Sequence, residues 1–149
     1  MPRTSVVTAV LTGALVASAL AFAAAPASAP APAPNAVQLE MQGLHELMVV
    51  SLVAIENDKL EVIAPTIHKV HGLKEQTGKA IASGAWKPAR GATPDFVAQD
   101  EAFHALLVSL LKSSKANDVA GTTRALSAVL EGCTSCHVKF RFPAKPAGK

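Results

Sequence analysis

Residues that favour strands are scarce in this chain. Tyrosine is absent, and aromatic side chains make up only 4% of the 149 residues. Stretches in which β-branched and polar residues alternate are also few, so no strand pattern competes with helix. Alanine is abundant, and half of all residues are apolar. This composition predicts an all-α protein with one hydrophobic core, because a chain of this length hardly supports two.

A strong excess of charge of either sign is missing too. Lysine and arginine number 14 and aspartate and glutamate 11. This mild imbalance gives no reason to expect nucleic acid as a partner. Basic residues gather only at the C-terminal end, where Lys139, Arg141, Lys145 and Lys149 lie. We expect residues 143–149 to be a basic tail.

The N-terminal segment, residues 1–29, has the features of a secretory signal peptide. Arg3 precedes an apolar run from Val6 to Ala25, and small residues suited to cleavage follow. The alternative is an uncleaved membrane anchor, but the run consists mainly of alanine and contains several polar or small residues. We therefore expect export to the periplasm. Residues 30–34 alternate proline and alanine, which favours an extended linker.

Four amphipathic helices are predicted within residues 35–142. The first begins at Asn35 as N-cap and ends near Asn57, and the second has an uncertain start because Pro65 lies near its beginning. The third opens with Thr93 as N-cap, after an irregular loop that contains Trp86, and the fourth spans 119–140. Trp86 is interpreted as a packing residue. The inward face of the first helix is expected to carry Val37, Met41, Leu44, Met48 and Ile55, and that of the second Ile63, Ile67, Val70, Thr77 and Ile81. The third is expected to bury Phe96, Phe103, Leu107, Leu110 and Leu111, and the fourth Val119, Leu126, Val129, Leu130, Cys133, Cys136 and Phe140. Short connections between such helices favour an antiparallel four-helix bundle.

Both cysteines of the chain stand in one short motif, Cys133-Thr-Ser-Cys136-His137. In an exported protein, Cys-x-x-Cys-His is the attachment motif of haem c: two thiols form thioethers with haem, and the imidazole binds the iron. On a helix these residues stand at i, i+3 and i+4, so they share one side. The motif predicts one covalent haem near the C-terminus, with His137 as an axial ligand.

The cysteine pair has three other interpretations. A zinc site needs four ligands, and among the remaining histidines only His68 and His71 have a paired spacing. A thioredoxin-like redox pair belongs at the start of a helix in a βαβ unit. A structural disulfide across so short a loop would stabilise little. His68, His71 and His104 are expected on the surface of the bundle.

The end of the domain resembles the class II c-type cytochromes, the cytochrome c′ family. The string C-T-S-C-H-V-K-F-R is similar to that family's ending, with Phe140 where tyrosine is common and Arg141 at the expected arginine. The resemblance implies a four-helix bundle whose C-terminal helix carries the haem. It also implies that Arg141 lies beside the histidine-bound face of haem and that a homodimer through the first two helices is compatible with this chain.

The segment V-Q-L-E-M-Q-G-L-H-E-L-M also resembles the family's first helix, and Met41 matches the position facing the iron opposite histidine. In low-spin members a methionine there binds the iron, and in high-spin members an apolar side chain leaves it five-coordinate. Met41 is therefore either the second axial ligand or a packing residue, as is Met48; His45 is a further candidate. The family's usual arginine before this position is replaced by Gln38 or Leu39.

The resemblance implies a periplasmic monohaem electron carrier rather than an enzyme, with His137 and Met41 as axial ligands and a redox protein as partner. The alternative is a five-coordinate protein that binds nitric oxide or another small gas. A third interpretation is a haem-free interaction bundle with a redox-active cysteine pair.

Overall fold

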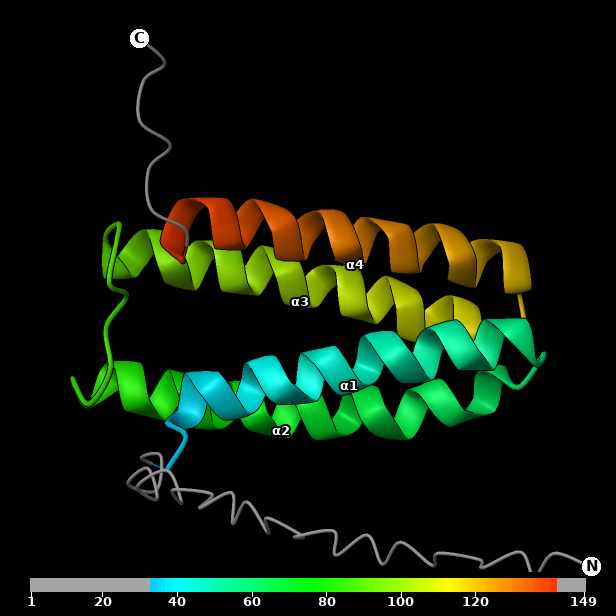
Figure 1. Ribbon diagram of the computed structural model, residues 1–149, viewed down its shortest axis with the longest axis horizontal. Helices are drawn as coiled ribbons and strands as arrows, with labels where there is room; N and C mark the ends of the chain where they lie inside the picture. The colour runs from blue at the N-terminus through cyan, green and yellow to red at the C-terminus, as the bar shows by residue number, and fades with distance from the viewer. Residues whose placement is uncertain (1–32, 142–149) are drawn as a thin grey trace, which may run out of the picture. The chain divides into compact units, whose positions relative to one another are not determined.

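The computed structural model describes residues 33–141 (Figure 1). The predicted signal peptide, linker residues 30–32 and the basic tail lie outside this range. The described residues form the α-helices α1 (Ala36–Glu56), α2 (Ile63–Ala82), α3 (Thr93–Lys115) and α4 (Val119–Phe140), with a short 3₁₀ helix, η1 (Leu60–Val62), before α2. No strand occurs among them, so the predicted all-α bundle of four helices is confirmed.

The helix starts are set by local capping. Asn35 accepts a hydrogen bond from the Gln38 N–H, and the Gln38 side chain accepts one from the Asn35 N–H, which completes a capping box. Asp118 accepts a hydrogen bond from the Gly121 N–H at 2.8 Å and begins α4. The predicted bounds of α1 and α4 are thereby confirmed.

One predicted start needs correction, and one that the sequence left open is now defined. Thr93 is not the N-cap of α3: Ala92 holds the extended cap conformation, and Thr93 is already helical. The sequence left the start of the second helix uncertain, and in the structure α2 begins at Ile63. Asp58 has a positive φ of 54°, η1 follows, and Pro65 falls in the first turn of α2, where its missing N–H costs no hydrogen bond.

The helices pack as two close pairs. α1 packs mainly on α2, and α4 mainly on α3, whereas α1 and α4 touch over a much shorter stretch. Tight approaches fix both pairs: a Cβ on Gly43 would lie 2.7 Å from Leu73, and one on Gly132 would lie 2.9 Å from Phe103 and Leu106. The N-terminal end of α1 and the C-terminal end of α4 lie at the same end of the bundle (Figure 1).

The core contains most of the predicted residues. Buried apolar side chains come from every helix: Leu44, Leu47, Ala54, Leu60, Ile63, Ile67, Val70, Phe96, Phe103, Leu107, Leu110, Leu126, Val129 and Phe140. Val37, Met41, Met48, Ile55, Ile81 and Leu111 are half-buried instead. Two predictions are wrong, because Val119 and Leu130 are 39% and 56% exposed.

Aromatic side chains hold the loop between α2 and α3 against the end of α4. The Trp86 ring lies 4.8 Å from the Phe96 ring, and Phe96 meets Phe140 edge to face at 5.3 Å between centroids. Gly91 has a positive φ of 73°, and a Cβ there would lie 2.8 Å from Phe140. Trp86 is therefore a packing residue, as predicted, and Phe140 anchors the helix that carries the cysteine motif.

Candidate haem-binding site

The cysteine motif lies inside the last two turns of α4. The helix continues past it, since the Arg141 N–H donates to the His137 carbonyl oxygen at 2.9 Å. Cys133, Cys136 and His137 are all half-buried and project from neighbouring positions of one helical face. The predicted grouping of these three side chains on one side of α4 is thus present in the structure.

The two thiols are free and poorly suited to redox exchange. Burial raises the pKa of the Cys133 thiol. Burial also raises the pKa of Cys136, and the nearby Asp100 carboxylate adds to this effect. Redox-active cysteine pairs need a lowered thiol pKa, because the thiolate is the reactive form. The electrostatics of this site therefore argue against the thioredoxin-like interpretation.

The His137 side chain is held in the form that binds metals. Burial lowers the pKa of His137, and the positive charge of Arg141 lowers it further. An imidazole must be neutral to offer a nitrogen lone pair to iron. Arg141 itself is exposed and forms the C-cap of α4.

His137 lies on the flank of α4 that is turned away from α3. Gly132 lies on the other flank and packs against α3. Leu130 stands seven residues before His137, so it shares the flank that is turned away from α3. On α1, Gly43 and Glu46 face α2, where Glu46 pairs with Lys69 at 2.5 Å. The opposite flank of α1 is therefore turned towards α4.

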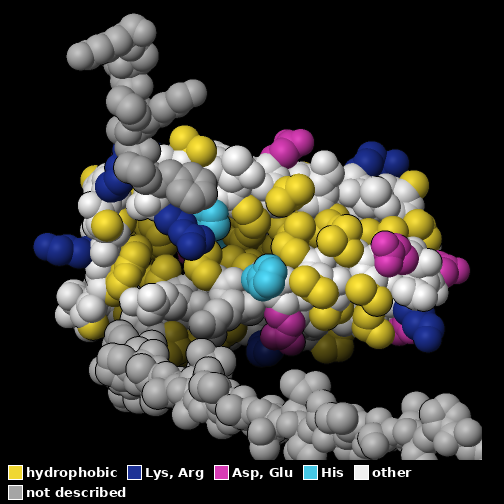
Figure 2. Space-filling model, in the orientation of Figure 1, with side chains coloured by type: hydrophobic (Ala, Val, Ile, Leu, Met, Phe, Trp, Pro, Cys, Tyr) yellow, Lys and Arg dark blue, Asp and Glu magenta, His cyan; other side chains and the backbone are white. Residues whose placement is uncertain are grey.

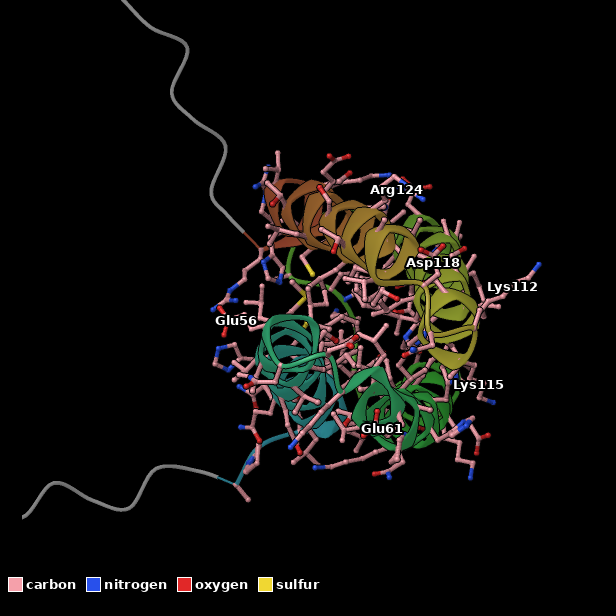
Figure 3. The ribbon with its side chains drawn as sticks, turned by 90° about the vertical axis from the view of Figure 1, so that its right-hand side faces the viewer. Glu56, Glu61, Lys112, Lys115, Asp118 and Arg124 are labelled. Carbon is pink, nitrogen blue, oxygen red and sulfur yellow. The ribbon has the colours of Figure 1, made fainter. Side chains whose placement is uncertain are left out.

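Met41 lies on this α4-facing flank of α1, together with Met48. Both side chains are half-buried and pack against the core. Seen along the bundle, the sulfur atoms of the described residues lie between α1 and α4 (Figure 3). Met41 is near the start of α1, and His137 is near the end of α4, so both are at the same end of the bundle (Figure 1). His45, the other candidate, is exposed on α1.

The seam between α1 and α4 has an apolar surface. Hydrophobic side chains gather along it, and the surface is hollowed towards the end where α4 finishes (Figure 2). Leu52 on α1 and Leu130 on α4 contribute to the exposed apolar area, at 54% and 56% exposure. A pocket at the opposite end of the bundle, where Glu61 and Lys115 point outward (Figure 3), lies far from the motif.

The sequence did not predict a buried polar cluster beside this site. Glu40 and His104 are almost completely buried, at 1% and 5% exposure, and a His104 ring nitrogen lies 2.7 Å from a Glu40 carboxylate oxygen. Asp100 lies one turn before His104, with 3.7 Å between their nearest atoms. The prediction that His104 lies on the surface is therefore wrong. His68 is exposed, as predicted, and His71 is half-buried with its ring 5.5 Å from that of His104.

A signal for the cluster was present in the spacing of α1. Glu40, Leu44, Leu47, Ser51 and Ala54 recur at helical intervals, and all five are buried.

Among residues 33–141, no helix combines the length and the hydropathy needed to cross a membrane. No protein-family model, curated protein or solved structure matches the chain.

Proposed function

We propose that this protein is a periplasmic monohaem c-type cytochrome that carries single electrons. Haem c is bonded to Cys133 and Cys136, and His137 and Met41 are the axial ligands. The observation that carries the proposal is the placement of both thiols and the imidazole on one face of α4, beside an apolar seam that leads to Met41. The bundle in this proposal is antiparallel, and export follows from the signal-like N-terminal sequence.

The two cysteines fit covalent attachment of haem. Their thiols are half-buried, and burial raises the pKa of both. In each attachment the S–H group adds across a vinyl double bond: a carbon–sulfur and a carbon–hydrogen bond form, while the S–H bond and the π bond break. No oxidant or reductant is consumed. The apolar seam between α1 and α4 offers the porphyrin a surface that excludes water.

The axial residues fit a single-electron carrier. When bound, haem supplies an iron that alternates between the ferric and ferrous states. His137 offers a neutral imidazole, because burial and Arg141 lower its pKa. Met41 offers a thioether, a soft ligand without charge that favours ferrous iron. No substrate bond is made or broken in this function, so the protein is a carrier and not an enzyme.

The charge near the site favours an acidic redox partner. Lys139 and Arg141 are exposed at the end of α4 that carries the motif. Positive side chains around an electron-transfer site speed the encounter with a negatively charged partner protein, and salt weakens this effect. The proposed partner is therefore a redox protein with an acidic surface.

A gas-binding protein with five-coordinate iron is the second candidate. It is favoured by one observation: Met41 and Met48 occupy equivalent positions seven residues apart, and both pack against the core. Methionine in such a place commonly fills core space. Iron without a second protein ligand would bind nitric oxide or another diatomic gas.

Replacement of Met41 by alanine distinguishes the two candidates, and Met48→Ala is the matched control. For the electron carrier, Met41→Ala should convert low-spin to high-spin iron and lower the reduction potential, while Met48→Ala should change neither. Visible spectra of the reduced proteins, with and without carbon monoxide, measure this. A wild-type protein that is already high-spin and binds carbon monoxide at once would exclude methionine ligation and support the gas-binding function.

A further inference from the structure

A buried group of three potential metal ligands joins α1 to α3. It consists of Glu40 from α1 and of Asp100 and His104 from α3, and we call it the acid–histidine cluster. One ligand atom from each residue lies within 4.8 Å of the other two. The two helices are not a closely packed pair, so the cluster bridges elements that otherwise have little contact.

Two polar atoms of the cluster are left without a hydrogen-bond partner. The second carboxylate oxygen of Glu40 and the Nδ1 atom of His104 are buried and have no hydrogen-bond partner. Lys74 is directed elsewhere, since it forms an ion pair with Glu101 at 2.7 Å. Two carboxyl groups therefore share one imidazole. An unpaired polar atom in the interior costs free energy, and a cation bound to the Glu40 carboxylate would offset that cost at Glu40.

We propose that the acid–histidine cluster binds one divalent transition-metal ion, with Zn²⁺ as the best fit. One imidazole nitrogen and two carboxylate oxygens are ligands of the kind that open zinc sites use. Bonds of about 2.0–2.2 Å in tetrahedral geometry place ligand atoms about 3.3–3.6 Å apart. The observed separations of 2.7 Å between Glu40 and His104 and 3.7 Å between Asp100 and His104 lie on either side of this spacing.

The ligand set distinguishes zinc from harder cations. Ca²⁺ takes six to eight oxygen ligands, and Mg²⁺ keeps an octahedral shell rich in water. Three side chains, two of them buried and one of them an imidazole, satisfy neither. The Asp100 side chain is 15% exposed, so a water molecule can reach the cluster as the fourth ligand. The proposal is independent of haem, because neither cysteine belongs to the cluster.

Isothermal titration of the purified full chain with ZnCl₂ tests the proposal. The cysteines are removed from competition, either by bound haem or, if no haem is attached, by alkylation with iodoacetamide. The wild type should bind one Zn²⁺ per chain, and MgCl₂ in excess should not displace it. Asp100→Asn and His104→Gln should each weaken binding on the order of tenfold or more.

Two variants serve as matched controls. Glu101→Gln makes the same chemical change at the exposed position next to Asp100, and His68→Gln does so at an exposed histidine. Both should bind Zn²⁺ within about twofold of the wild type, a change far smaller than the loss of a ligand produces. If His104→Gln does not fold, Asp100→Asn decides the question, since Asp100 is the least buried ligand.

Three results would overturn the proposal. The first is no stoichiometric binding to the wild type. The second is equal affinity in Asp100→Asn, and the third is loss of binding in His68→Gln, which would place zinc on the His68 and His71 pair instead. Zn²⁺ should also raise the melting temperature of the wild type but not that of Asp100→Asn, because the ion crosslinks α1 to α3 only in the folded state.

Discussion

A Glu40 carboxylate oxygen on α1 lies 2.7 Å from a ring nitrogen of His104 on α3, in the interior of the bundle. The next residue after Glu40 is Met41, the proposed axial ligand. The hydrogen bond therefore fixes the rotation of α1 at the point where the methionine turns towards α4. If Met41 binds iron as proposed, stability and iron ligation are linked at this position.

This hydrogen bond should show strong coupling in a double-mutant cycle. Glu40→Leu or His104→Leu alone leaves a buried polar partner unpaired and should lower the free energy of unfolding by about 3–5 kcal/mol. The loss of unfolding free energy in the double variant should be smaller than the sum of the two single losses by about 1–3 kcal/mol, because neither polar side chain is then left without its partner. Urea unfolding with a metal chelator present measures all three. Additive losses would show that the two side chains do not interact.

Asp100 should make the folded protein less stable as the pH rises from about 4 to about 6. Burial, followed by the Glu40 carboxylate, raises the pKa of Asp100 from 3.8 to about 6. Between these values the folded protein holds a proton that the unfolded chain releases, so the free energy of unfolding falls with increasing pH. For a single proton the slope is at most about 1.4 kcal/mol per pH unit.

The variant Asp100→Asn should remove this loss, because its amide does not titrate. Glu101→Gln is the control. The hydrogen bond from Lys74 lowers the pKa of Glu101, so the contribution of Glu101 to stability grows as the pH rises, opposite to that of Asp100. Glu101 is exposed, so this contribution is small. Denaturation of the three proteins at several pH values gives the comparison. An unchanged pH profile in Asp100→Asn would disprove the raised pKa.

Two glycine substitutions should change stability in opposite directions. A Cβ on Gly132 would lie 2.9 Å from Phe103 and Leu106, so Gly132→Ala should destabilise the packing of α4 on α3 by about 1–3 kcal/mol. Nothing lies within 4 Å of a Cβ on Gly78, in the C-terminal part of α2. Gly78→Ala should therefore stabilise by about 0.5–1 kcal/mol through helix propensity. Thermal melts that show the same sign for both would contradict the observed helix packing.

The sequence predicted features that local interactions determine. Asn35 and Asp118 are followed by residues whose N–H groups they can cap, and the starts of α1 and α4 are correct for that reason. Thr93 also has the side chain of an N-cap, but its backbone is helical, and Ala92 takes the cap position. Side-chain type alone does not distinguish two adjacent backbone conformations.

Tertiary contacts explain what the sequence did not predict. Glu40 and His104 are polar, so residue type predicts them outward even though Glu40 falls on the buried stripe of α1. Only their pairing across the bundle makes burial tolerable. Leu130 is apolar but exposed, since its flank of α4 is turned away from α3. The grouping of Cys133, Cys136 and His137, in contrast, depends only on helical spacing within one turn, and this is why the sequence could predict it.

Covalent attachment of haem through Cys133 and Cys136 is the central claim, and the intact mass of the mature protein tests it most directly. The full chain is expressed in a host that matures c-type cytochromes, beside a variant with both cysteines replaced by alanine. The wild type should exceed the mass of its amino acids by one haem after acid–acetone extraction, and the variant should not. A wild-type mass equal to that of the polypeptide alone would contradict the account.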